Sequence, residues 1–99
     1  MYRGTTPILY LELDTDLSLD NLAEVWVTFK VSTTEVTKTL SDIGIDDKTL
    51  IVQLSQEDTL KLYNGRCDVQ VRFKLDNGLA YASTVESINI ERILKEGVI

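Results

Sequence analysis

Residues 67–75 have the sequence CDVQVRFKL, in which apolar and polar side chains alternate at every position. Alternation with period two is typical of a β-strand that buries one face and exposes the other to solvent. Five apolar side chains, from Cys67 to Leu75, therefore share one face. We expect this stretch to be a central strand of an antiparallel sheet.

Shorter stretches elsewhere show the same alternation. After Pro7, whose missing N–H suits the start of an edge strand, leucines occupy every second position up to Leu13. The most β-prone stretch places Val25, Val27 and Phe29 on one face. The stretches that we expect to form these strands are residues 9–13, 25–31, 36–40, 43–45 and 50–54.

One short helix is expected between the strands. Ser55 is followed three residues later by Asp58, which resembles a capping box and predicts one or two helical turns over residues 56–62. Residues 14–23 lack strand alternation. We expect a loop there, with or without a helical turn over residues 19–23.

The turn that contains Gly78 has two possible forms. It is either a two-residue type I′ turn or a three-residue loop with Gly78 in the left-handed region. We favour the second form, because it places Phe73 near Tyr81 and Val69 near Val85. Apolar residues are then opposite apolar residues.

The last strand leaves a further alternative open. Ile88 and Ile90 have the opposite parity from Val85. Either a bulge near Glu86 resets the register, or the strand is apolar on both faces.

About seven short strands, one small helix and frequent turns predict an all-β fold. We expect a single domain over residues 1–99, an immunoglobulin-like antiparallel β-sandwich with one short helix. An open barrel is the alternative. The 43% of hydrophobic residues is too high for a disordered chain.

Charge and hydropathy limit the partners. The chain has 16 acidic and 10 basic side chains, a net charge of −6, which disfavours nucleic acid and anionic membranes. No stretch reaches the roughly 18 consecutive apolar residues of a membrane span, and Met1–Gly4 precede Thr and Pro instead of an apolar signal core. We expect a soluble chain that is not secreted by this route.

Few groups are suited to catalysis. The chain has one cysteine and no histidine, which excludes an internal disulfide, a Cys/His zinc cluster and imidazole catalysis. Cys67 lies on the apolar face of its strand, where it should be a small core residue with a raised pKa. The glutamates are so numerous that no catalytic pair for glycoside hydrolysis is singled out, and no glycine-rich phosphate loop exists. We expect neither an enzyme nor a cofactor.

Three aspartates form the sharpest polar pattern. Asp14, Asp16 and Asp20 could offer oxygen ligands to Ca²⁺ from one loop. An EF-hand counted from Asp14 needs a glycine and a glutamate where this chain has Leu19 and Val25. A solvated turn is therefore favoured over a calcium site.

Two aromatic residues are candidates for binding. Trp26 and Tyr10 both lie opposite the apolar row of their strand, where they could form a platform for a sugar or a protein. A second sheet or the chain termini could equally cover them, and we favour this alternative.

The C-terminal segment is unusually apolar. Ile93, Leu94, Val98 and Ile99 occur where a free end would normally be polar. We expect either packing on the domain itself, or contact with a second copy or a partner, for example by addition of a strand to an exposed edge.

Four short motifs carry a resemblance to a known group of proteins. They are MYRGTTP at 1–7, WVTFK at 26–30, SQEDT at 55–59 and RILKEGVI at 92–99. With them the chain resembles small prophage-encoded proteins of Gram-positive bacteria and, more loosely, the N-terminal domain of phage baseplate upper proteins. The motifs contain no active-site residues.

The resemblance implies a non-enzymatic phage structural or assembly module, which is in the bacterial cytoplasm when it is made and then in the tail or baseplate of the virion. Its expected partners are other phage structural subunits or further copies of itself. The alternative is a carbohydrate-binding β-sandwich that uses Trp26 and Tyr10, with calcium at Asp14, Asp16 and Asp20.

Overall fold

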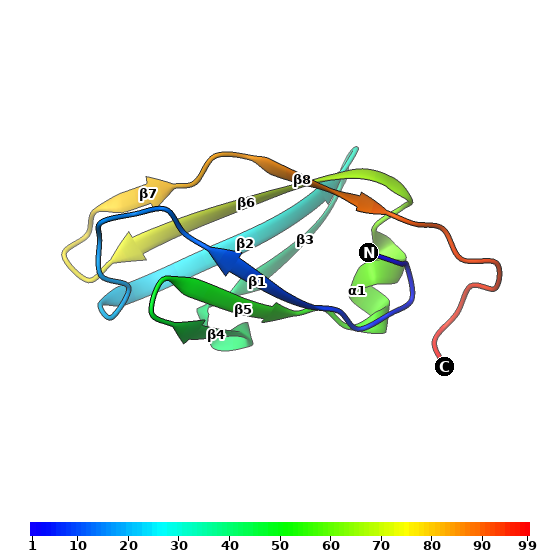
Figure 1. Ribbon diagram of the computed structural model, residues 1–99, viewed down its shortest axis with the longest axis horizontal. Coiled ribbons are helices and arrows are strands. Elements are labelled where there is room, and N and C mark those ends of the chain that lie inside the picture. The colour runs from blue at the N-terminus through cyan, green and yellow to red at the C-terminus, as the bar shows by residue number, and fades with distance from the viewer.

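The computed structural model describes residues 1–99 and consists of two β-sheets packed face to face (Figure 1). Every pairing between neighbouring strands is antiparallel. One sheet has the order β3 (Thr34–Thr39), β2 (Leu22–Val31), β6 (Gly65–Leu75) and β7 (Ala80–Ala82), and β8 (Glu86–Ile90) also pairs with β6. The other has the order β1 (Ile8–Glu12), β5 (Thr49–Gln53) and β4 (Ile43–Asp46). The predicted all-β sandwich is confirmed, whereas its immunoglobulin-like kind stays a prediction.

The core lies between the two sheets. Val27 and Phe29 of β2 are fully buried, as are Leu50 and Val52 of β5 in the opposite sheet. These residues belong to one cluster of 16 buried apolar side chains. Because the inward side chains of a strand occupy every second position, the alternation of the sequence assigned these faces correctly.

β6 is the central strand, as its alternation predicted. It pairs with β2 along one side and with both β7 and β8 along the other. Phe73 pairs with Tyr81, and their rings stack with centroids 5.4 Å apart. Gly78 has a φ of 88°, and the Leu75 N–H donates to the Leu79 carbonyl across three residues. The favoured three-residue loop is confirmed.

The pairing expected further along β6 is wrong by one residue. Val69 pairs with Glu86 instead of Val85. Between β7 and β8, the Val71 N–H donates to Ser83 Oγ at 3.0 Å, so a side chain takes the place of a backbone acceptor. This break shifts the register by one residue, as expected for the alternative of a bulge near Glu86. As a result, Ile90 points into the core, where it is 2% exposed.

The structure decides one open local alternative and corrects one local expectation. Residues 19–23 contain no helical turn, since the Asn21 carbonyl accepts from the Asp76 N–H and β2 already begins at Leu22. The strand expected to reach Leu40 ends at Thr39, and Leu40–Asp42 form a 3₁₀ turn in which Thr39 N–H donates to Asp42.

The helix α1 (Gln56–Lys61) lies at one end of the sandwich, beside the N-terminus (Figure 1). Its predicted capping box is present, with Ser55 N–H donating to Asp58 Oδ2 at 2.9 Å and Asp58 N–H donating to Ser55 Oγ at 3.1 Å. The chain has no helix with the length and apolar character needed to cross a membrane.

Candidate interaction surfaces

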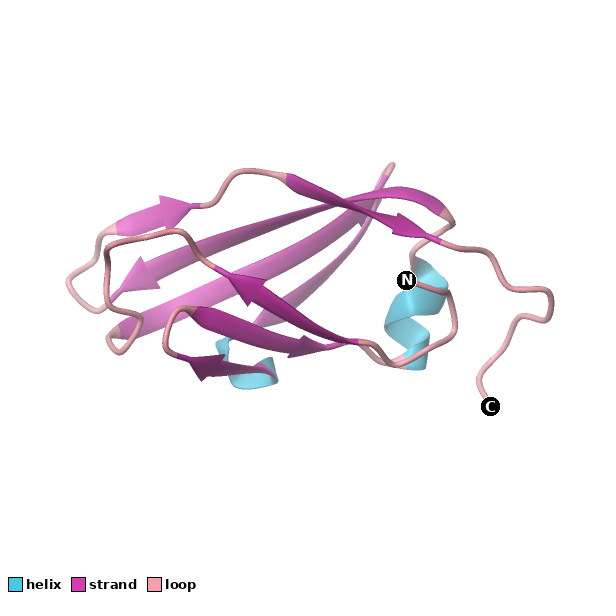
Figure 2. Ribbon diagram, viewed as in Figure 1, coloured by secondary structure: helices cyan, strands magenta, loops and turns pink.

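The largest hollow described here is a groove lined by residues of β1, β6, β7 and β8. No further strand lies between β1 and the β7–β8 edge to close the two layers on this side (Figure 2). The volume of the groove is about 520 Å³, which is in the usual range for ligand sites. It lies over buried apolar residues of the five-stranded sheet. Its apolar lining includes Leu9, Leu11, Phe29, Val71 and Ile88, and Tyr10 of β1 also lies along it.

β1 is paired with β5 on one side only, and the backbone groups on its other side, toward this groove, are unpaired. The Leu13 N–H donates to the Lys48 carbonyl, and the Leu54 N–H donates to the Pro7 carbonyl. The odd-numbered residues of β1 therefore point their backbone groups toward β5. Successive residues of a strand point these groups to opposite sides. Because β1 has no second neighbour, the N–H and C=O groups of Ile8, Tyr10 and Glu12 form a free edge.

The charged residues of the groove are all acidic. Glu12, Asp14 and Glu86 line it, all three are exposed, and no lysine or arginine is among the lining residues. Glu86 is at the groove because the register break places it, in place of Val85, opposite the inward-facing Val69. The groove therefore combines an apolar interior with a negative border.

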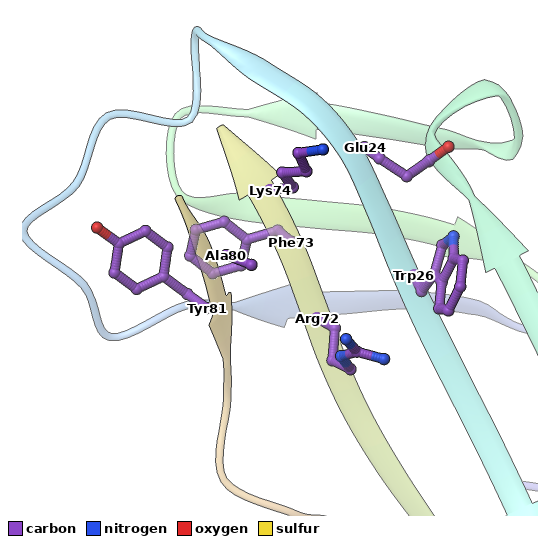
Figure 3. A pocket seen from close by; sticks show the side chains of 7 residues that line it. All are labelled: Glu24, Trp26, Arg72, Phe73, Lys74, Ala80 and Tyr81. Carbon is purple, nitrogen blue, oxygen red and sulfur yellow. The ribbon is translucent and has the colours of Figure 1, made fainter. Parts of the chain in front are cut away.

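A second surface is the outer face of the five-stranded sheet around Trp26, called here the Trp26 face. Trp26 is 47% exposed, and the Arg72 guanidinium lies 5.5 Å from its ring centroid, a cation–π contact. Two hollows of about 200 and 440 Å³ share these two residues. Figure 3 shows the smaller one, in which Trp26 and Glu24 extend from β2, and Arg72 and Lys74 extend from β6.

The larger hollow of the Trp26 face is lined by hydroxyl groups. Thr28, Thr37 and Thr39 lie around it together with Glu35, and the hydroxyls of Thr28 and Thr37 are 3.2 Å apart. The surface thus offers one aromatic ring surrounded by donors and acceptors.

Tyr10 does not share a surface with Trp26. It is 68% exposed on the outer face of the three-stranded sheet, whereas Trp26 lies on the outer face of the other sheet. Neither a sheet nor a terminus covers these side chains, so the favoured expectation of cover is wrong. A single platform built from both residues is excluded, because the two outer faces point away from each other.

The three aspartates of the 14–20 loop are all exposed. The chain contains no group of three His, Cys, Asp or Glu side chains arranged to hold a metal ion. Asp14, Asp16 and Asp20 are therefore not brought together as calcium ligands. Lys48 Nζ donates to the Thr15 carbonyl at 2.5 Å, so the ammonium group already interacts with this loop.

The C-terminal segment contacts its own domain mainly through polar groups. Glu96 forms an ion pair with the buried Arg3, and the Ile99 backbone exchanges two hydrogen bonds with the Gln56 amide. Ile93 is partly buried near Gly4. The remaining apolar side chains of the segment are exposed, by 96% for Leu94, 56% for Val98 and 105% for Ile99.

Cys67 is fully buried on the inner face of β6. Burial raises the pKa of its thiol, which keeps the unreactive thiol form at neutral pH. The prediction of a small core residue is confirmed.

Two residues of these surfaces were missed by the sequence interpretation. The β2–β6 register pairs Arg72 with Trp26, and the register break turns Glu86 toward the groove. The polar parity of Arg72 was visible, but its neighbour depends on the register between strands more than 40 positions apart in the chain. Pairing of that range is set by tertiary packing.

The comparisons with known proteins return no similar protein: no family model matches the chain, and neither a curated protein nor a solved structure matches it.

Proposed function

We propose that the chain is a non-enzymatic interaction module that joins structural subunits of a phage particle, in the tail or baseplate. The observation that carries the proposal is the free edge of β1 beside the open groove. Unpaired edges are usually shielded, because they offer a row of backbone donors and acceptors to other chains. An exposed edge next to an apolar groove is suited to docking.

The chemistry of the chain supports a binding role over a catalytic one. The carboxylates along the groove are exposed, and the single thiol is buried in the core. Catalytic acids generally occupy sites where burial tunes their pKa. The motifs that resemble prophage proteins supply the phage context.

The direct test is the protein content of particles. We expect mass spectrometry of purified phage particles from a strain that encodes the chain to detect it at a fixed ratio to the major tail protein. Particles that lack the chain in repeated preparations would contradict a structural role. The lysate before purification is the control that the chain is made.

A second candidate function is carbohydrate binding at the Trp26 face. The favouring observation is the half-exposed Trp26 ring between two hollows that are lined by Arg72, Lys74 and threonine hydroxyls. Sugars present C–H groups suited to an aromatic ring and hydroxyls suited to such polar groups. This proposal involves no calcium, since the aspartate loop forms no carboxylate cluster.

Calorimetry with cell-wall oligosaccharides, with and without Ca²⁺, tests this second function. Binding should disappear in Trp26→Ala, be unaffected by Ca²⁺, and remain in Tyr10→Ala, whose substitution lies on the opposite face. Equal binding by both variants would remove the Trp26 face from consideration.

A further inference from the structure

We propose that the groove between β1 and the β7–β8 edge binds an extended segment of a partner protein in which apolar residues alternate with lysine or arginine. The inference rests on the proposed role as an interaction module and names the chemistry of the partner. Three properties of the groove support it: an unpaired strand edge, an apolar interior and an acidic border.

The backbone of β1 provides the first property. Ile8, Tyr10 and Glu12 present unpaired N–H and C=O groups along the free edge of β1, and Tyr10 and Glu12 also line the groove. An extended peptide can add to such an edge as a further strand, so that main-chain hydrogen bonds supply affinity. The added strand would extend the three-stranded sheet on the side of β1.

The apolar interior provides the second property. Leu9 and Leu11 line the groove on the β1 side, Ile88 on the β8 side, and Phe29 and Val71 beneath. Every second side chain of an added strand would point inward between them. An apolar cavity of about 150 Å³ holds one benzene-sized group, so a groove of about 520 Å³ admits about three apolar side chains.

The acidic border provides the third property. Glu12, Asp14 and Glu86 are not balanced by any basic lining residue. A segment that carries lysine or arginine between its apolar residues complements this charge, whereas an acidic segment is repelled.

Other occupants fit this border less well. A second copy of the chain has a net charge of −6 and would bring its own acidic β1 edge to the groove. The C-terminal segment of the same chain is held elsewhere, by the Arg3–Glu96 ion pair and by Gln56.

Two synthetic peptides serve as probes, KVKVKVK and EVEVEVE. Calorimetry in low salt should detect binding of the basic peptide by the full chain, with affinity that falls as salt is raised, and no binding of the acidic peptide. Absence of binding by KVKVKVK, or equal binding of both peptides, would overturn the inference.

Tyr10→Pro tests the strand edge. Proline removes the Tyr10 N–H, which does not bond to β5, and an edge strand tolerates it. We expect the affinity of Tyr10→Pro for KVKVKVK to be at least tenfold weaker than that of the matched Tyr10→Thr variant, which also loses the ring but keeps the N–H. Circular dichroism of both variants verifies the fold. Equal affinities would show that β1 is not the docking edge.

A charge reversal tests the border. The double variant Glu12→Lys, Glu86→Lys should lose KVKVKVK and gain EVEVEVE. The control Glu35→Lys, Glu57→Lys has the same net charge but changes sites outside the groove, and should keep the original preference. The same preference in both double variants would mean that total charge, not the groove, selects the peptide.

Two further outcomes separate this inference from its alternatives. A dimer that Tyr10→Pro dissociates would identify a second copy as the occupant and overturn the partner chemistry. If Tyr10→Pro and Tyr10→Thr enter phage particles equally well, the inference fails while the proposed function stands. If the chain is absent from particles but binds KVKVKVK as described, the proposed function fails and the groove remains a site for basic strands.

Discussion

The Arg3 side chain donates a hydrogen bond of 3.2 Å from Nε to the carbonyl oxygen of Leu62, just beyond the C-terminal end of α1. Its Nη2 donates to the Leu60 carbonyl at 2.7 Å, and its guanidinium lies 5.3 Å from the Tyr63 ring centroid. The last carbonyls of a helix lack partners within the helix. Arg3, which is only 6% exposed, satisfies them and attaches the N-terminal segment to α1.

Replacement of Arg3 should therefore destabilise the fold. We expect Arg3→Met to lower the free energy of unfolding by about 2–4 kcal/mol, because buried carbonyls lose charged donors. Arg3→Lys should recover only part of this free energy, since an ammonium lacks the planar fork that reaches both carbonyls. Urea unfolding provides the measurement, with the exposed Arg92→Met as control. A loss below about 0.5 kcal/mol for Arg3→Met would contradict this role.

The Asp58 carboxylate should make stability depend on acid. Burial raises the pKa of Asp58, but hydrogen bonds from Lys38 Nζ, 2.6 Å away, and from Ser55 N–H outweigh it, so the pKa lies below its ordinary value of 3.8. A lowered folded pKa means that the carboxylate stabilises the folded state fully above pH 3.8. This contribution is lost as the pH falls from 3.8 through the folded pKa.

Asp58→Asn should thus lower the free energy of unfolding by about 1.5–3 kcal/mol at pH 7, the range for hydrogen bonds to charged groups. Below pH 3.8, the difference from the parent should shrink. Unfolding curves between pH 2 and pH 7 measure both effects, and Glu57→Gln, an exposed neighbour in α1, is the control. A difference that is constant over this range would contradict the assigned role of the charge.

Ser83 should stabilise the register break between β7 and β8. Its Oγ accepts from the Val71 N–H at 3.0 Å, and its N–H donates to the Val71 carbonyl at 2.8 Å. Ser83→Ala leaves the Val71 N–H without its acceptor, which costs about 1–3 kcal/mol for a buried donor. We expect that loss in urea unfolding and faster amide exchange at Val71. Ser87→Ala, in the exposed part of β8, should change neither, and identical exchange in both variants would refute the assignment.

The alternation of side chains was sufficient to predict most strands and their inner faces. Cys67, Val69, Val71 and Phe73 are buried on one face of β6 because a strand repeats every two residues whatever its partner is. Local chemistry also predicted the capping box at Ser55, since both members lie within one helical turn.

Apart from the strand end at Thr39, what the sequence left open or predicted wrongly consists of relations between distant segments. A side chain, Ser83, sets the offset between Val69 and Glu86, and the pairing of Asn21 with Asp76 keeps the preceding loop from forming a helical turn. The two candidate surfaces depend on such relations. Whether Trp26 is covered, and which strands lie at the sheet edges, follow from sheet order, which period-two alternation does not encode.

Removal of residues 92–99 should separate two roles of the C-terminal segment. The deletion eliminates the Glu96 partner of Arg3 and the Ile93 contact with Gly4, so we expect a loss of about 1 kcal/mol, which corresponds to a fall in Tm of about 4–8 °C for a domain of this size. Leu94→Ser with Val98→Ser should leave Tm unchanged, because both side chains are exposed in the single chain. Calorimetry measures Tm, and light scattering measures the mass in solution. A deletion that changes neither would show that the segment contributes to neither folding nor assembly, whereas a fall in Tm for the double serine variant would show that these exposed side chains are buried in solution by another copy.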